Sequence, residues 1–222
     1  AILLLYWPAL IYFASTPDPY SVTGNAVVRF DLWTLGASHL SKEGPFPFEP
    51  EGILSTPSSV VIAVAGLLTG NFIQTRGIDY KAIAKLITIG AALVIIAYLW
   101  NFTFPVNKKL WSSSFILLGI GLDCIIISCI IYLVDLKGIN TGVYFFKVFG
   151  RNPLFIYLLA EMTAVVMEKI KIGNMDVRQF LYSEVFAKAG PYTGSLLFAL
   201  FIMFFCWTVG YILDRNKIYI RV

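Results

Sequence analysis

Apolar stretches alternate with polar connections along the whole chain, and they fall at residues 1–14, 55–74, 82–103, 112–134, 143–166 and 194–213. Most come close to the roughly 20 apolar residues that an α-helix needs to cross about 30 Å of hydrocarbon. Helices also satisfy their own backbone polar groups in lipid. The pattern predicts an all-α, polytopic membrane protein with about six transmembrane helices, forming a single integral membrane domain over residues 1–222.

The polar connections alternate between long and short, with long ones at 15–54 and 167–193. Pro and Gly crowd the first of these, which favours ordered turns. Lys and Arg are slightly enriched near the span ends on the membrane side opposite these two segments. Short cytoplasmic loops are typically enriched in Lys and Arg, so that side is the cytoplasmic one and both long segments lie outside. We therefore predict that 15–54 is an extracytoplasmic loop folded over the mouth of the bundle, and that the C-terminus is cytoplasmic.

Composition excludes several classes of protein. The chain is 58% hydrophobic and 14% charged, whereas soluble domains have about 45–50% apolar and about 25% charged residues. A net charge of +4 without a basic tract gives no support for nucleic-acid binding. One histidine, with three cysteines inside apolar runs, provides no usual zinc site or disulfide.

The first residues are apolar, with neither an initiator Met nor a basic segment, so they do not form a signal peptide. They resemble a span entered partway. We expect an N-terminal portion of a longer protein to precede them.

Two carboxylates lie within expected spans, at Asp123 and Glu161. Ionisable groups are costly in hydrocarbon, so each is a candidate functional residue. A hydrogen-bonded carboxyl between helices is the structural alternative. We predict that Glu161 faces the bundle interior, together with Tyr157 and Val165 at helical spacing.

His39 is the single histidine, and it lies in the long loop ahead of Glu49-Pro50-Glu51-Gly52. An imidazole is suited to accept a proton at neutral pH, although a lone loop histidine is also commonly structural. Glu51 either orients this histidine or caps a helix that begins near Ile53. Arg151 precedes Asn152-Pro153 at the start of a span, where an arginine also reaches lipid phosphate.

Several segments, in order, resemble one family. They are Arg29–Asp31 with His39-Leu40, Phe48–Thr56, Phe104–Ser114, Val134–Gly138, Phe149–Leu154 with Tyr157, and Tyr211–Lys217. Together they are similar to the heparan-α-glucosaminide N-acetyltransferase family of transmembrane acyltransferases, including its NagX-like bacterial relatives. The resemblance covers the C-terminal part of the family. The family's Asp-Pro-Glu-Gly pattern reads Glu49-Pro50-Glu51-Gly52 here.

This resemblance implies acetyl transfer from acetyl-CoA to an amino sugar across a membrane, in bacteria the inner membrane, without a metal. It implies a catalytic role for His39 and Glu51. The implied acceptor-binding residues are Asp31, Glu49, Asn107, Asn152 and Glu161, and those for the acetyl-CoA phosphates are Lys108, Lys147 and Arg151. Interfacial anchoring is an equal alternative for Lys108.

Two other functions stay open. A permease for amino sugars such as N-acetylglucosamine also uses midplane carboxylates in a helical bundle. A non-catalytic membrane scaffold is the third reading. The expected partners are an amino-sugar acceptor and membrane lipid, without nucleic acid, and a homodimer stays open.

Overall fold

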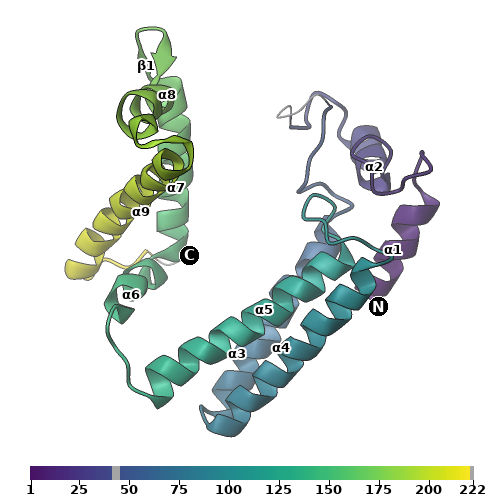
Figure 1. The fold of residues 1–222 in the computed structure, drawn as a ribbon, viewed down its shortest axis with the longest axis horizontal. Helices are drawn as coiled ribbons and strands as arrows, with labels where there is room; N and C mark the ends of the chain where they lie inside the picture. The colour runs from purple at the N-terminus through teal and green to yellow at the C-terminus, as the bar shows by residue number, and fades with distance from the viewer. Residues whose placement is uncertain (42–45, 221–222) are drawn as a thin grey trace. The chain divides into compact units, whose positions relative to one another are not determined.

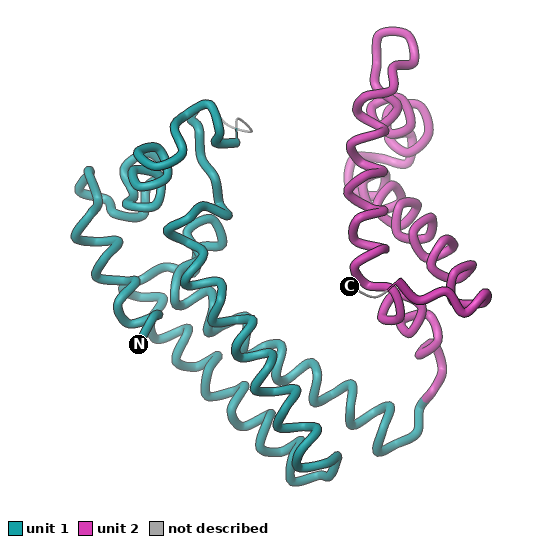
Figure 2. Tube along the Cα trace, turned by 180° about the vertical axis from the view of Figure 1, so that it is seen from behind, with its two compact units in different colours: residues 1–139 teal, residues 140–222 magenta. Residues whose placement is uncertain are grey.

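The computed structural model describes residues 1–41 and 46–220, and it is helical apart from one two-stranded hairpin. The all-α prediction is therefore confirmed. Residues 42–45 of the expected loop 15–54 lie outside the described residues. The chain packs as two compact units, Ala1–Ile139 and Asn140–Val222 (Figure 2). That it acts as a single membrane domain stays a prediction.

Unit 1 contains five helices (Figure 1): α1 (Ile2–Tyr12), α2 (Ala26–Thr34), α3 (Thr56–Arg76), α4 (Tyr80–Asn101) and α5 (Ser113–Ile131). A π-helical turn, η1 (Tyr132–Leu136), extends α5. Side-chain caps fix the starts of α2, α4 and α5: Asn25 accepts from the Val28 N–H at 2.9 Å, Asp79 from the Ala82 N–H at 2.6 Å and Ser112 from the Phe115 N–H at 3.3 Å.

Helices α4 and α5 lie side by side along most of their length (Figure 1). They approach most closely at Gly90 and Gly121. A Cβ atom on Gly90 would lie 2.7 Å from the Gly121 carbonyl oxygen, and the reverse distance is also 2.7 Å. Small residues allow helix backbones to approach in this way in membranes.

Helix α2, within the long loop, packs on α1 and on the connection between α4 and α5. Tyr6, Leu10, Val27, Phe104 and Leu110 are the larger members of this buried cluster. The Tyr6 hydroxyl donates to the Leu110 carbonyl at 2.7 Å, a contact between residues 104 positions apart. These contacts hold α2 over the end of α1.

Unit 2 begins with α6 (Val143–Arg151) and α7 (Pro153–Lys169). A hairpin of β1 (Lys171–Ile172) and β2 (Met175–Asp176) follows, then α8 (Val177–Leu181), the π-helical turn η2 (Tyr182–Phe186), the short helix η3 (Ala187–Ala189) and α9 (Pro191–Arg215). Gly173 adopts φ 63° at the first turn position of the hairpin, where a type II′ turn places glycine.

Among residues 1–41 and 46–220, four helices are long and apolar enough to span a membrane, namely Thr56–Arg76, Tyr80–Asn101, Ser113–Leu136 and Pro191–Arg215. The chain is thus that of an integral membrane protein, but the expected number of about six spans is not confirmed. The segment 1–14 forms only an 11-residue helix, about 16 Å long at 1.5 Å per residue.

The expected span 143–166 is divided at Asn152, whose φ of −134° and ψ of 52° are not helical. Pro153 lacks the N–H that a continuous helix would need, so it starts α7 instead. The two resulting helices have 9 and 17 residues.

Candidate functional site

His39 follows the C-terminal end of α2, where Gly36 adopts φ 78° and turns the chain back. The imidazole Nδ1 lies 2.8 Å from the Leu35 carbonyl oxygen and 3.2 Å from Ser38 Oγ. Because a carbonyl oxygen only accepts hydrogen bonds, Nδ1 carries the proton and Nε2 of the neutral ring carries the lone pair. The residue is exposed, so this nitrogen is accessible.

Asp31 lies three residues before the end of the same helix, but it is buried, with 1% of its surface exposed. Its Oδ1 accepts a hydrogen bond from the Ile53 N–H at 3.0 Å. Its Oδ2 has no hydrogen-bond partner among the described residues. Burial is the main effect that raises the pKa of Asp31, and the charge of Glu49 adds to it, whereas bonds from the Ile53 and Leu54 amides oppose it.

The contact between Asp31 and the turn at residues 49–53 requires a glycine. A Cβ atom on Gly52 would collide with Asp31 Oδ2. Glu49 Oε1 accepts from the Glu51 N–H at 3.3 Å, which closes the turn. The structure thus brings Asp31 together with the Glu49–Gly52 turn. The order of the segments along the sequence did not predict this contact.

Glu51 is exposed. In the described parts of the chain, the bonded partners of the His39 ring are Leu35 and Ser38 rather than Glu51. Helix α3 begins at Thr56 and has no acidic residue in its first turn, so the expectation that Glu51 caps it is wrong.

Asn107 shapes the connection between α4 and α5. Its Oδ1 accepts from the Lys109 N–H at 2.9 Å, and its own N–H donates to Ser112 Oγ at 2.9 Å. Lys108 is exposed beside it. The amide expected to meet a ligand therefore stabilises a turn, with a lysine free to reach outward.

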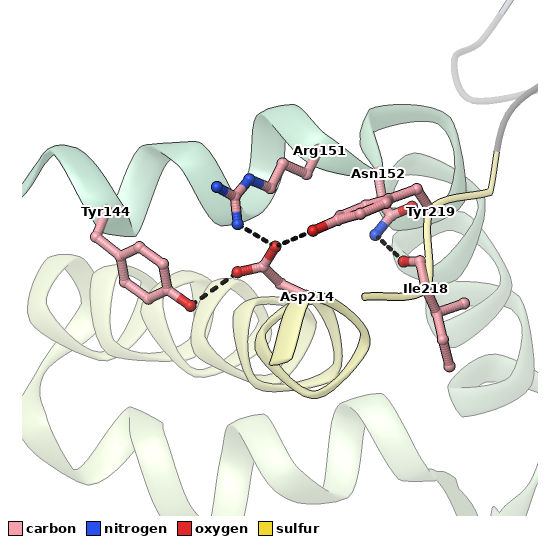
Figure 3. A network of polar contacts seen from close by, with 6 residues as sticks. All are labelled: Tyr144, Arg151, Asn152, Asp214, Ile218 and Tyr219. Atoms are coloured by element: carbon pink, nitrogen blue, oxygen red, sulfur yellow. Dashed lines mark hydrogen bonds and ion pairs between the residues drawn. The ribbon is translucent and has the colours of Figure 1, made fainter. Parts of the chain in front are cut away.

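A second cluster lies in unit 2, where Asp214 near the end of α9 accepts three hydrogen bonds (Figure 3). Its Oδ1 pairs with Arg151 and also receives the Tyr219 hydroxyl at 3.4 Å, and its Oδ2 receives the Tyr144 hydroxyl at 2.8 Å. The pairing with Asp214 raises the pKa of Arg151, and the bond to Asp214 raises the pKa of Tyr144. Arg151 keeps 43% of its side chain exposed, so it also presents charge outward.

Asn152 is fully buried next to this cluster and uses both ends of its amide on the C-terminal tail. Its Nδ2 donates to the Ile218 carbonyl at 3.0 Å, and its Oδ1 accepts from the Ile220 N–H at 2.8 Å. Figure 3 shows the first of these bonds. In this structure the amide expected to bind acceptor holds the tail against the break between α6 and α7.

Lys147 and Glu161 are both exposed within unit 2. Tyr157 and Val165 are 61% and 54% exposed, so the face of α7 that they share with Glu161 is not covered within residues 140–220. That this face points into a bundle stays a prediction. No group of three His, Cys, Asp or Glu that could hold a metal occurs in ranges 1–41 and 46–220.

Asp214 is a site residue that the sequence did not predict, although it lies inside the resembling segment Tyr211–Lys217. The feature of the sequence that could have pointed to Asp214 is an acidic residue among basic ones at the end of an apolar segment. Its partners could not be read from the sequence, because Arg151 lies 63 positions away.

Membrane-length helices and two polar clusters at helix ends define a polytopic membrane protein of the helical class. No family model matches the chain. The chain is similar to human heparan-alpha-glucosaminide N-acetyltransferase, with 28% identity over 219 residues that cover 90% of this chain and 30% of the human protein. It is also similar to the mouse protein of the same name, with 31% identity over 158 residues that cover 63% of this chain and 24% of the mouse protein.

These relatives confirm the resemblance inferred from the sequence segments. The chain spans less than a third of the length of either relative. That it corresponds to their C-terminal part stays a prediction.

Proposed function

We propose that the protein containing this chain is a membrane acetyltransferase that moves an acetyl group from acetyl-CoA to an amino sugar. The observation that carries this proposal is the similarity of 90% of the chain to a human protein named for N-acetyl transfer to heparan-α-glucosaminide. The membrane-length helices support it, because they provide the membrane setting that transfer across a bilayer needs.

In this proposal His39 is the general base. Its Nε2 takes the proton from the acceptor amine while the amine nitrogen attacks the thioester carbonyl carbon. The new C–N bond forms, the C–S bond breaks, and CoA leaves as a thiolate that takes up a proton. The bond from Nδ1 to the Leu35 carbonyl supports this role, because it fixes the tautomer with a free Nε2.

The acceptor is bound near the same loop. Asp31 holds the Glu49–Gly52 turn in place, and Glu49 and Glu51 present their carboxylates there. An amine and sugar hydroxyls are donors that such carboxylates accept. Asn107 positions the connection on which Lys108 stands.

The donor phosphates are bound at the other side of the membrane by Lys147 and Arg151, which lie one turn apart on α6. Both present charge outward from this helix. We propose a cytoplasmic C-terminus, a bacterial inner membrane and an extracytoplasmic loop 15–54.

The test uses the complete protein in membranes, supplied with acetyl-CoA and D-glucosamine. N-acetylglucosamine and free CoA thiol should appear in equal amounts. His39→Gln should lower the rate about 10²-fold or more at a normal folded yield. Ser38→Ala is the matched control, because it removes the second Nδ1 neighbour and keeps the Leu35 bond, so its rate should stay near normal.

A normal rate for His39→Gln would refute the general-base role. An unaltered protein that releases neither product would refute the acetyltransferase proposal as a whole.

A second candidate function, an amino-sugar permease, is favoured by Asp123. This carboxylate lines a cavity of about 310 Å³ between α3 and α5, together with Thr69 and Gly70. A carboxylate at a cavity inside membrane-length helices is typical of transport pathways. Uptake of labelled N-acetylglucosamine into proteoliposomes without acetyl-CoA, lost in Asp123→Asn, would support it. Absence of uptake by the unaltered protein would exclude it.

A further inference from the structure

A cavity of about 580 Å³ lies in unit 2, where the end of α7, the hairpin, α8, η2 and the start of α9 meet. Its lining includes Glu168, Asp176, Arg178, Gln179, Tyr182 and Phe198. Small-molecule sites typically enclose about 300–1,000 Å³. None of these residues belongs to the two clusters around His39 and Asp214.

The polar part of the lining is held in place by its own contacts. Arg178 donates to Glu168 Oε1 at 2.6 Å, which joins α8 to the end of α7. Asp176 caps α8, with Oδ1 accepting from the Gln179 N–H at 2.7 Å. This bond uses one oxygen, while a carboxylate offers acceptor sites on two.

Tyr182 and Phe198 form an aromatic wall of the cavity. The Phe198 ring meets the Tyr182 ring edge to face at a centroid distance of 6.1 Å, and it meets Phe186 at 5.5 Å. Helix α9 approaches η2 closely enough that a Cβ atom on Gly194 would lie 2.5 Å from the Phe186 carbonyl oxygen. Close packing of the two backbones therefore fixes the position of the aromatic wall. A π-helical turn such as η2 also often occurs at functional sites.

We propose that this cavity is a second binding site for the amino-sugar acceptor, separate from the loop around His39, and that it holds the sugar as an ammonium-bearing pyranose; this rests on the proposed function. Planar carboxylate, amide and guanidinium groups suit the donors and acceptors of sugar hydroxyls. The aromatic wall suits the apolar C–H face of the ring. The carboxylates of Glu168 and Asp176 in the lining are charged acceptors that suit a protonated amine.

The position within unit 2 supports the same ligand. Helix α9 begins beside the cavity at Pro191 and ends at Arg215. Its 25 residues span roughly 37 Å at 1.5 Å per residue. The cavity thus lies at the end of the unit opposite to Lys147 and Arg151, on the segment 167–193 that we place outside the membrane. An acceptor that arrives from outside would meet it there.

The test measures binding of D-glucosamine and of neutral N-acetylglucosamine to the complete protein in detergent by titration calorimetry without acetyl-CoA. Asp176→Asn removes the charge and keeps a favoured helix cap. We expect it to weaken D-glucosamine binding about tenfold and to leave N-acetylglucosamine binding within about twofold. Phe198→Leu should weaken both sugars by similar factors, because it removes the aromatic face that both contact.

Glu184→Gln is the matched control. Glu184 lies on η2 and pairs with Lys188 at 3.6 Å, so this change removes a nearby negative charge without altering the cavity lining. The proposal is overturned if the unaltered protein does not bind D-glucosamine, if Asp176→Asn binds it normally, or if Glu184→Gln weakens it as much. If D-glucosamine binding depends on Asp176 but no acetyl transfer occurs, the cavity is upheld as a sugar site and the proposed function fails.

Discussion

Gly52 lies against the buried carboxylate of Asp31, and Gly52→Ala tests whether this contact holds the connection between α2 and α3. The new Cβ atom would collide with Asp31 Oδ2. The carboxylate cannot move away easily, since Asp31 is 1% exposed and its Oδ1 is bonded to the Ile53 N–H at 3.0 Å. Losing that charged bond costs about 1.5–3 kcal/mol and overpacking about 1–3 kcal/mol. Because relaxation relieves part of this, we expect the free energy of unfolding to fall by about 2–4 kcal/mol.

The assay is a denaturant titration of the complete protein in detergent, followed by fluorescence, with limited proteolysis of the loop as a local readout. The double variant with Gly52→Ala and Asp31→Ala should lose no more free energy of unfolding than Asp31→Ala alone, because the Asp31 carboxylate with which the new Cβ atom collides is then absent. Gly119→Ala is the control: its Cβ atom would meet nothing within 4 Å, and alanine favours a helix. The reasoning is refuted if Gly52→Ala has the same free energy of unfolding as Gly119→Ala. It is also refuted if the effects of Gly52→Ala and Asp31→Ala on that free energy are fully additive.

Three further predictions follow from single contacts. Burial raises the pKa of Asp31, so the folded state binds the carboxyl proton more tightly than the unfolded state does. The free energy of unfolding should therefore fall as the pH rises from the ordinary carboxyl range through the raised pKa. Asp31→Asn should flatten this pH dependence in unfolding titrations at several pH values. Gly121→Val should lower the thermal unfolding midpoint measured in detergent, because the Cβ position lies 2.7 Å from the Gly90 carbonyl oxygen. Asn152→Leu should lower the free energy of unfolding by about 1–3 kcal/mol, since it removes the two hydrogen bonds from the buried Asn152 amide to Ile218 and Ile220. It should also speed proteolytic release of the C-terminus.

The sequence was sufficient for the membrane-length helices, because an apolar run of about 20 residues has few other folds available to it. The sequence pattern did not predict the helix boundaries where a single backbone position interrupts a helix. The segment 143–166 is apolar enough to suggest a span, yet Pro153 and the non-helical Asn152 divide it. Hydrophobicity averages over a window and does not register such a break.

The site residues show the same limit for a different reason. His39 could be selected as a candidate from residue chemistry alone, but its Leu35 partner depends on how Gly36 turns the chain. Asp31 and Ile53 are 22 positions apart, so their hydrogen bond is a product of loop packing. Spacing along the sequence contains no information on such contacts, which is why the expected pairing of His39 with Glu51 does not appear among the described contacts.

Unit 2 carries exposed cations near both ends of α9. Lys147, Arg151, Arg215 and Lys217 lie toward the end where that helix stops, and Lys169, Lys171, Arg178 and Lys188 lie near its start, around the cavity with Glu168 and Asp176. Because cytoplasmic loops are the ones enriched in Lys and Arg, these equal numbers favour neither orientation of the unit. Acids distinguish the two ends instead, since Glu168, Asp176 and Glu184 lie near the start of α9 and Asp214 lies near its end. An anionic donor, as proposed above, would therefore be attracted more strongly to the end near Asp214, where fewer acids offset the cations.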